Sequence, residues 1–224
     1  MPPMNERTRV VLRGSSGHAT VVSEAMELTG RLELVGCIDD VDPAPRTTAA
    51  GRVLGSSERL GELRSSGVAH IVVAVGDNAA RLELAARAEA LGFAAATVIH
   101  PPASVSERAQ VGPGTVICAG AVIAPTARLG AHCIVYHGAS VDHDTMVDDG
   151  VRVGPGSHVA GHVHVGRGTQ LGVGTSVRDG VRIGAHTVVG AGAAVVGDLP
   201  DSCVAVGVPA HVVSRSSGSR SSVE

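Results

Sequence analysis

The chain has 224 residues, a formal net charge of −3 and an aromatic content of 1%, although 44% of its residues are hydrophobic. This charge and the shortage of aromatic stacking platforms argue against a nucleic-acid-binding protein. No apolar run approaches the roughly 20 residues that a membrane helix needs. The first twelve residues lack the apolar region of a signal peptide. We therefore expect a cytoplasmic protein with neither nucleic acid nor membrane as a partner.

The four cysteines also favour a cytoplasmic protein. They form no CxxC pair and no metal-ligand spacing, and they are Cys37, Cys118, Cys133 and Cys203. We interpret them as reduced, packed side chains of a cytoplasmic protein.

Residues 1–100 alternate short apolar segments with helical ones. Helices are expected up to about residue 29 and over 79–91, and strands over 9–12, 32–40, 70–78 and 95–100. Strand–helix alternation predicts a parallel sheet covered by helices. The first hundred residues are therefore predicted to form a Rossmann-like α/β domain.

A glycine-rich turn at residues 13–19 follows the first strand and opens the first helix. Backbone N–H groups in such a turn can bind phosphate, and the acidic pair Asp39-Asp40, roughly twenty residues on, could hold ribose hydroxyls. The turn reads GxxGH rather than the full GxGxxG fingerprint, so a tight turn without a ligand stays an alternative. A nucleotide or nucleotide sugar fits better than a redox dinucleotide, because the rest of the chain is a repeat.

Every sixth residue from Val105 to Val195 is Val, Ile or Leu, without a break in phase. The residue two places earlier is small or β-branched, and glycine often follows the sixth residue, where we expect it to relieve a turn. A period of six fits neither an α-helix nor an alternating strand. It is the hexapeptide signature of a parallel β-helix. We expect this fold over residues 101–213, with roughly five coils and a disordered Ser-rich tail at 214–224.

The order of several motifs resembles the bacterial sugar acetyltransferases of the PglD/NeuD type over about residues 8–212. The motifs are GSSGHA (14–19), IDD (38–40), VAVGDN (73–78), IHPPA (99–103), VDHD (141–144), VAGHVHVG (159–166) and VGVPA (206–210). The resemblance implies a left-handed β-helix and a homotrimer with active sites between neighbouring prisms. It also implies acetyl-CoA as cosubstrate and a nucleotide sugar held by the first domain.

The resemblance assigns individual residues. His143 matches the catalytic histidine, and Asp144 matches the acidic residue that orients it. The nucleotide-sugar contacts match Ser16, Gly17, His18, Asp39, Asp40 and Gly76. Positions along the acetyl-CoA groove are assigned to Arg152, Gly161, Val173 and Ala191.

The chemistry of His143 agrees with this role. A neutral imidazole with a pKa near 6.5 can take a proton from an attacking amine, and a carboxylate at Asp142 or Asp144 could fix its tautomer. His143 follows the inward Val141 by two residues, so it should point outward. Judged without the family motif, His137 is an alternative base.

Most of the other histidines in the second half are interpreted as solvent-exposed side chains on the outer surface of the β-helix. Two of them, His162 and His164, alternate along the chain. Without acidic partners at a defined spacing they do not predict a metal site.

Three positions depart from the family pattern. Arg152 stands where many members have histidine, and arginine cannot act as a base. Tyr136-His137 replaces a common Asn-Thr pair, and His211 stands where Lys or Arg usually follows VGVPA. These departures put acceptor recognition and CoA affinity in question.

The preferred function is acetyl-CoA-dependent N-acetylation of a nucleotide-linked amino sugar, by direct transfer with a histidine base. Two alternatives stay open: O-acetylation of a sugar hydroxyl such as that of sialic acid, and a non-catalytic trimer that binds a nucleotide sugar. The sequence names neither the sugar nor the nucleobase.

Overall fold

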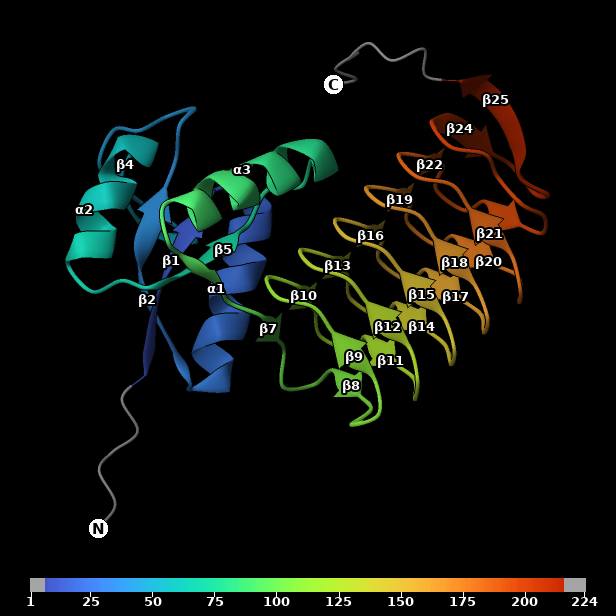
Figure 1. The fold of residues 1–224 in the computed structure, drawn as a ribbon, viewed down its shortest axis with the longest axis horizontal. Coiled ribbons are helices and arrows are strands. Elements are labelled where there is room, and N and C mark those ends of the chain that lie inside the picture. Colours follow the sequence, from blue (N-terminus) through green and yellow to red (C-terminus); the bar gives the residue numbers. More distant parts are fainter. Residues whose placement is uncertain (1–6, 216–224) are drawn as a thin grey trace.

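The computed structural model describes residues 7–215, which form an α/β domain followed by a left-handed parallel β-helix (Figure 1). The α/β domain, blue to teal in Figure 1, lies beside the lower coils of the triangular prism, which runs from green to red. The fold class predicted from the sequence is therefore confirmed. Within the described residues, no helix is both long and apolar enough to span a membrane.

The α/β domain is built on sheet A, whose strand order is β3-β4-β2-β1-β5-β6. Its strands are β1 (Thr8–Arg13), β2 (Leu32–Ile38), β3 (Arg46–Thr48), β4 (Gly51–Gly55), β5 (His70–Val73) and β6 (Ala94–Ala95). Its helices are α1 (Gly17–Thr29), the 3-10 turn η1 (Ser57–Arg59), α2 (Leu60–Ser65) and α3 (Asn78–Ala90). Neighbouring strands are parallel except for the β3–β4 hairpin. The hairpin and α2 were not expected, because residues 46–65 carry no clear periodicity.

Helix α1 is positioned by its ends and its apolar face. Ser16 precedes it in an extended conformation, and Gly30 ends it with φ 65°, donating its N–H to Glu27 O. Ala19, Val22 and Met26 are fully buried, where α1 packs on β2 and on the first prism strand. The turn before α1 is thus held at the carboxyl end of β1.

The prism consists of three sheets, in which the two-residue strands pair in parallel with the strand 18 residues further on. Sheet B contains β7 (Val98–Ile99), β10 (Val116–Ile117), β13 (Ile134–Val135), β16 (Arg152–Val153), β19 (Gln170–Leu171), β22 (Val188–Val189), β24 (Cys203–Val206) and β25 (His211–Arg215). Sheet C contains β8 (Ser104–Val105), β11 (Val122–Ile123), β14 (Ser140–Val141), β17 (His158–Val159), β20 (Ser176–Val177) and β23 (Ala194–Val195). Sheet D contains β9 (Gln110–Val111), β12 (Arg128–Leu129), β15 (Met146–Val147), β18 (His164–Val165) and β21 (Arg182–Ile183).

The hexapeptide pattern forms the interior of the prism. The second residue of each short strand points inward, and Ile117, Val141 and Leu171 are fully buried. The small residue two places earlier fills the same layer, and its hydroxyl, where present, bonds to a backbone carbonyl, as Thr145 Oγ1 does to Ala160 O at 2.8 Å. Side chains of this size fill thin layers without aromatics.

The prism exceeds its predicted limits at both ends. β7 at residues 98–99 already pairs with β10, so sheet B starts before residue 101. β25 pairs antiparallel with β24 as far as Arg215, so residues 214–215 belong to a strand and not to a tail. The rest of the expected tail, 216–224, lies outside the described residues.

Contrary to the expectation from the sequence, the glycines that follow the inward residues do not relieve turns. The glycines that follow the inward residue, such as Gly112 and Gly154, do not have positive φ. A Cβ at either position would come within 2.6 Å of backbone atoms in the next coil, so these glycines allow coils to stack. The left-handed turn residues stand two positions later. One column of them, at the edge between sheets C and D, is Thr126, Asp144, His162 and Gly180.

The α/β domain packs against sheet B. The outward residues Val98, Val116 and Ile134 are buried beneath it. The cross-section of the prism is a triangle, so the edge between sheets C and D lies opposite sheet B. We call this the C/D edge, and the edge between sheets B and C the B/C edge.

Candidate functional site

A pocket of about 630 Å³ opens at the carboxyl ends of β1, β2 and β5 in the α/β domain. Of the residues predicted to contact the nucleotide sugar, four line it: Ser16, Asp39, Asp40 and Gly76. The other two do not. Gly17 begins α1, and His18 turns towards the prism.

The two pocket carboxylates are held by neighbouring groups. Asp39 accepts hydrogen bonds from Ser15 Oγ, from Arg46 and from the backbone N–H of Val41 at 2.9 Å. Burial alone would raise the pKa of Asp39, but these hydrogen bonds outweigh it and hold that pKa below its usual value. Asp39 therefore stays charged and fixes the loop after β2.

Asp40 forms an ion pair with Arg13 and accepts the backbone N–H of Ser57 at 2.7 Å. The hydrogen bond from Arg13 holds the pKa of Asp40 well below its usual range. Its side chain is 43% exposed, so Asp40 keeps surface available to a ligand, whereas Asp39 is 15% exposed. Arg13 and Arg46, which also line the pocket, were not singled out from the sequence. Arg13 could have been, because it directly precedes the glycine-rich turn.

His18 joins the pocket loop to the prism. Its Nδ1 lies 3.3 Å from the Tyr136 hydroxyl. Burial, helped by the nearby charge of Arg81, lowers the pKa of His18 to about 4. His18 is therefore neutral near pH 7 and belongs to the junction between the two domains.

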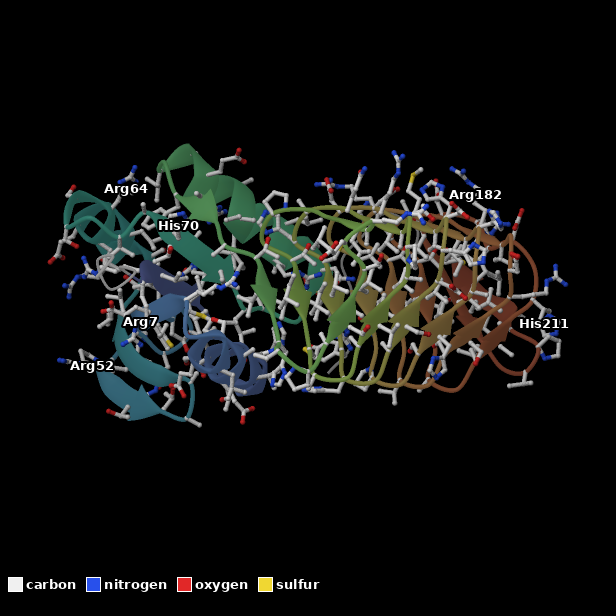
Figure 2. The ribbon with its side chains drawn as sticks, turned by 90° about the horizontal axis from the view of Figure 1, so that it is seen from below. Arg7, Arg52, Arg64, His70, Arg182 and His211 are labelled. Atoms are coloured by element: carbon white, nitrogen blue, oxygen red, sulfur yellow. The ribbon has the colours of Figure 1, made fainter. Side chains whose placement is uncertain are left out.

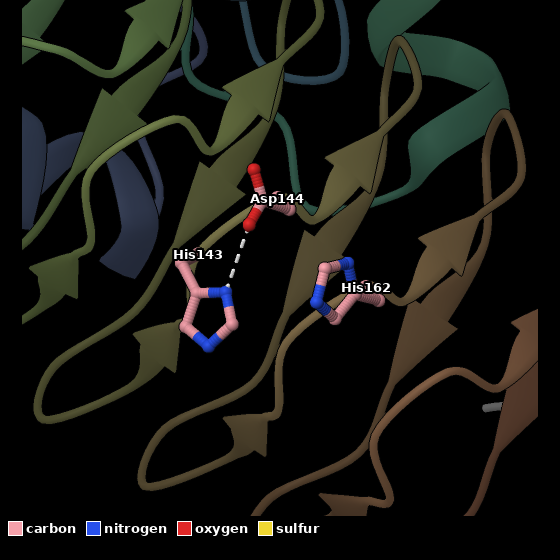
Figure 3. A group of neighbouring side chains, drawn as sticks. All are labelled: His143, Asp144 and His162. Carbon is pink, nitrogen blue, oxygen red and sulfur yellow. Dashed lines mark hydrogen bonds and ion pairs between the residues drawn. The ribbon is translucent and has the colours of Figure 1, made fainter.

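The predicted catalytic pair lies elsewhere, on the C/D edge (Figure 3). His143 points outward, and its Nδ1 lies 3.0 Å from Asp144 Oδ2. Both side chains are about half exposed, at 51% and 48%. Asp144 occupies a left-handed corner position with φ 55°, and its backbone N–H donates to Thr126 Oγ1. Thr126 and His162 of the same column share this backbone conformation, so it belongs to the corners of the prism.

The electrostatics of the pair suit a general base. The hydrogen bond to Asp144 raises the pKa of His143, with further contributions from the charges of Asp142 and Asp179. The same hydrogen bond lowers the pKa of Asp144. The Nδ1–H of His143 is thus directed at a carboxylate, which leaves the Nε2 lone pair free to accept a proton. His137, the alternative base, lies instead on the B/C edge next to Gly138.

Gly161 supports the ring of His143. A Cβ at Gly161 would lie 2.8–3.2 Å from three ring atoms of His143. The imidazole therefore rests on the bare backbone of the next coil. Gly161 was assigned to the acetyl-CoA groove, and the structure gives it this additional position under the histidine.

His162 completes a group that could hold a metal ion. One ligand atom each of His143, Asp144 and His162 lie within 4.8 Å of one another, and all three residues are exposed. The two imidazole rings meet edge to face at 5.2 Å. His164 is not part of this group, because it points out from sheet D and pairs with Asp148 at 3.1 Å.

The residues assigned to acetyl-CoA are spread over the prism. Val173 and Ala191 stack one coil apart on the B/C edge, where Gly192 N–H donates to Val173 O. Arg152 points out from sheet B and reaches Gly76 of the α/β domain at 3.5 Å. One chain therefore does not bring His143 together with Val173, Ala191 or the pocket.

Two families match successive parts of the chain. Residues 9–88 match the PglD N-terminal domain, and residues 93–197 match the GMPPB C-terminal domain. No curated protein sequence matches significantly.

Solved structures resemble the whole chain. A histidine-to-asparagine mutant of perosamine N-acetyltransferase from Caulobacter crescentus, in complex with CoA and GDP-perosamine, is 40% identical, with a TM-score of 0.89, and the match covers 92% of this chain and 96% of that one. The acetyltransferase domain of PglB from Neisseria gonorrhoeae, in complex with acetyl coenzyme A, is 34% identical, with a TM-score of 0.87, and the match covers 92% of this chain and 100% of that one. WeeI from Acinetobacter baumannii, at 21% identity and a TM-score of 0.74, shares the fold. With a nucleotide-pocket domain, a prism carrying an outward histidine–carboxylate pair and these relatives, the chain belongs to the PglD-type sugar acetyltransferases.

Proposed function

We propose that this protein transfers an acetyl group from acetyl-CoA to the amino group of a nucleotide-linked amino sugar. The observation that carries the proposal is the outward His143–Asp144 pair on a chain that also has a nucleotide-sized pocket. The relative from Caulobacter crescentus, which was crystallised with CoA and GDP-perosamine, supports the substrate class.

The proposed chemistry is a direct transfer within a ternary complex. The amine attacks the thioester carbonyl carbon, and His143 Nε2 takes the proton that the amine loses. The tetrahedral intermediate then collapses, the carbon–sulfur bond breaks, and the imidazolium returns the proton to the departing thiolate. Asp144 stabilises the imidazolium between these steps, as the hydrogen bond to Nδ1 indicates.

A covalent acyl-enzyme finds no support among the cysteines. All four are free and buried. Burial raises the pKa of Cys37 and Cys133 to about 11 and that of Cys118 to about 12, so these thiols are protonated and poorly nucleophilic near pH 7. Four free cysteines also fit a reducing compartment, which supports a cytoplasmic location.

We further propose that the active site is shared between subunits of a homotrimer. The C/D edge that carries His143 lies opposite the face that carries the pocket domain. In a closed ring of three prisms, the C/D edge of one subunit can face the sheet B side and the B/C edge of its neighbour. Val173 and Ala191 would then line the acetyl-CoA groove opposite the neighbour's histidine.

A thiol-release assay tests the function. Acetyl-CoA is combined with UDP-, GDP- and dTDP-linked amino sugars and with free sialic acid, and EDTA is present because the exposed His–Asp–His group could take up trace metal. We expect release with one nucleotide amino sugar and its loss in His143→Ala. Release with sialic acid alone would replace the proposal by O-acetylation, and no release with any acceptor would refute both.

A further inference from the structure

Arg152 is a half-buried cation without a counter-ion. It points outward from β16 of sheet B, where the equivalent residue one coil below is the buried Ile134. Among the described residues no carboxylate pairs with Arg152, and its Nε is buried without a hydrogen-bond partner. Within residues 7–215, the hydrogen bond that its side chain makes is Nη1 to Gly76 O at 3.5 Å, which is long for a hydrogen bond.

The groups that the structure places next to Arg152 are an aromatic ring and a histidine. Its guanidinium carbon lies 5.8 Å from the centroid of the Tyr136 ring, and Tyr136 in turn contacts His18. His18 Nε2 is also buried without a partner. Two nitrogen-bearing groups with unused hydrogen-bonding capacity therefore lie together between the prism and the loops that open the pocket.

This position adjoins the nucleotide pocket. Gly76, over which the Arg152 guanidinium lies, lines the pocket together with Ser16. A third buried nitrogen without a partner, Arg13 Nη1, belongs to a pocket-lining residue. Two guanidinium nitrogens without a hydrogen-bond partner are therefore found here: Nη1 of Arg13, which lines the pocket, and Nε of Arg152, which lies beside it.

The charge and shape of the Arg152 side chain indicate which kind of ligand would bind it. Removing a cation from water without an opposite charge is unfavourable, and a guanidinium matches the oxygens of a phosphate in a two-pronged geometry. Of the groups on a nucleotide sugar, the diphosphate is the anionic one.

We propose that Arg152 binds the diphosphate of the nucleotide sugar from the prism side, and so acts as a substrate-binding residue. This rests on the proposed function for the identity of the ligand. It differs from the assignment of Arg152 to acetyl-CoA that the sequence suggested. It also explains how an arginine can replace a histidine there, because the position then needs a permanent positive charge and not a base.

Calorimetric titration of the intact protein tests the proposal without turnover. The ligands are UDP, GDP, the corresponding monophosphates, inorganic pyrophosphate and CoA. Arg152→Gln is expected to weaken binding of the preferred nucleoside diphosphate and of pyrophosphate about tenfold or more, as loss of a charge-assisted hydrogen bond would. Binding of the monophosphate should weaken less, and Arg152→Lys should retain part of the affinity.

Arg182→Gln is the matched control, because Arg182 is an exposed arginine on sheet D, far along the prism from the α/β domain (Figure 2). Its affinities should equal those of the unmodified protein. Melting temperature and mass in solution, measured for each variant, exclude misfolding as the cause of a weaker affinity.

Three results would overturn the proposal. In the first, Arg152→Gln binds the diphosphate normally but loses CoA, which would return Arg152 to the cosubstrate. In the second, the variant keeps its affinities but loses its oligomeric mass, which would make a neighbouring subunit the partner of Arg152. In the third, the unmodified protein binds neither diphosphate nor pyrophosphate. If diphosphate binding depends on Arg152 but no acetyl transfer occurs, the proposed function fails and this inference stands.

Discussion

The position of His143 depends on the residue one coil further along. Its ring lies over Gly161, and any side chain there would collide with the imidazole. Its Nδ1 is directed by Asp144, which occupies a corner that most residues avoid. At this scale the site consists of a histidine held by a carboxylate on one side and by a bare backbone below.

Gly161→Ala should lower kcat at least tenfold while the protein stays folded. The new methyl group would displace the His143 ring, and Gly161 does not have positive φ, so alanine adds no backbone strain. Initial rates and thermal melts measure the two effects. Gly197→Ala serves as control, since a Cβ there meets nothing within 4 Å, and an equal loss in both variants would contradict this account.

Asp144→Asn should lower activity and move the acidic limb of the pH–rate profile to lower pH. The base acts when neutral, so activity is lost as the pH falls through the pKa of His143. Asp144 raises that pKa, so replacing Asp144 lowers the pKa of His143 and moves the acidic limb to lower pH. The profile of kcat/KM, measured with EDTA, checks the direction. A limb that stays in place or moves up would show that Asp144 does not act on His143 in this way.

At the scale of elements, two buried side chains tie α3 to the prism: Asn78, whose Nδ2 donates to Gly168 O at 2.9 Å, and Arg81. Arg81 is 1% exposed, and it donates to His132 O at 2.9 Å, to Gly150 O at 2.8 Å and to carbonyl groups of the loop before α3. Burial lowers the pKa of Arg81 to about 10, so the side chain remains charged near pH 7. Arg81 thus joins the pocket domain to the prism by several hydrogen bonds.

Arg81→Met should destabilise the protein by about 3–5 kcal/mol, because several buried carbonyls would lose their donor. Denaturant unfolding measures the difference. Arg87→Met is the control: Arg87 lies on the same helix but is exposed and pairs with Glu83, so its replacement should change stability by less than about 1 kcal/mol. Similar losses of unfolding free energy in both variants would show that Arg81 does not stabilise the contact between α3 and the prism.

The contact of α1 with the prism should make stability sensitive to acid. The pKa of His18 is about 4 in the folded protein, against 6.5 for an unperturbed histidine. A depressed histidine pKa means that the unfolded chain binds the proton more tightly, so stability is lost as the pH falls below about 6.5. His18→Gln should remove a loss on the order of 1–2 kcal/mol between pH 6.5 and pH 5. Unfolding curves over this range check it, and equal slopes for both proteins would count against the buried neutral histidine.

At the scale of the whole molecule, the prism separates the two halves of the site. The pocket domain covers sheet B, and His143 lies on the opposite edge. No rearrangement of side chains could join them within one chain, because the rigid stack of coils lies between them.

A mixture of two inactive variants should therefore regain activity. In co-expressed trimers of His143→Ala and Gly76→Asp, a shared site needs its histidine from one variant and its pocket from the other. Each is supplied with a probability of about one half, so about a quarter of the sites should work. Thiol release by the purified mixture, compared with each variant alone, measures this. A mixture that stays inactive would place both halves of the site in one subunit.

The sequence by itself determined the repetitive part of the fold. A six-residue period specifies which side chain of each short strand points inward, and the regular alternation of apolar and helical segments specified the α/β domain. Local spacing is sufficient for these features, and it also predicts that His143 points outward, because it falls just after an inward position. The assignment of His143 as the base, ahead of His137, and of Asp144 as its partner came from the VDHD motif and the family resemblance.

The tertiary structure alone decided the rest. The burial of His18 against Tyr136, the lack of a counter-ion at Arg152 and the hydrogen bonds that engage Asp39 all join segments far apart in the chain. The spacing of these residues in the sequence does not predict the contacts. The sequence also could not show which edge of the prism each residue occupies relative to the pocket domain. That depends on how the domain packs on sheet B, and packing is a long-range property.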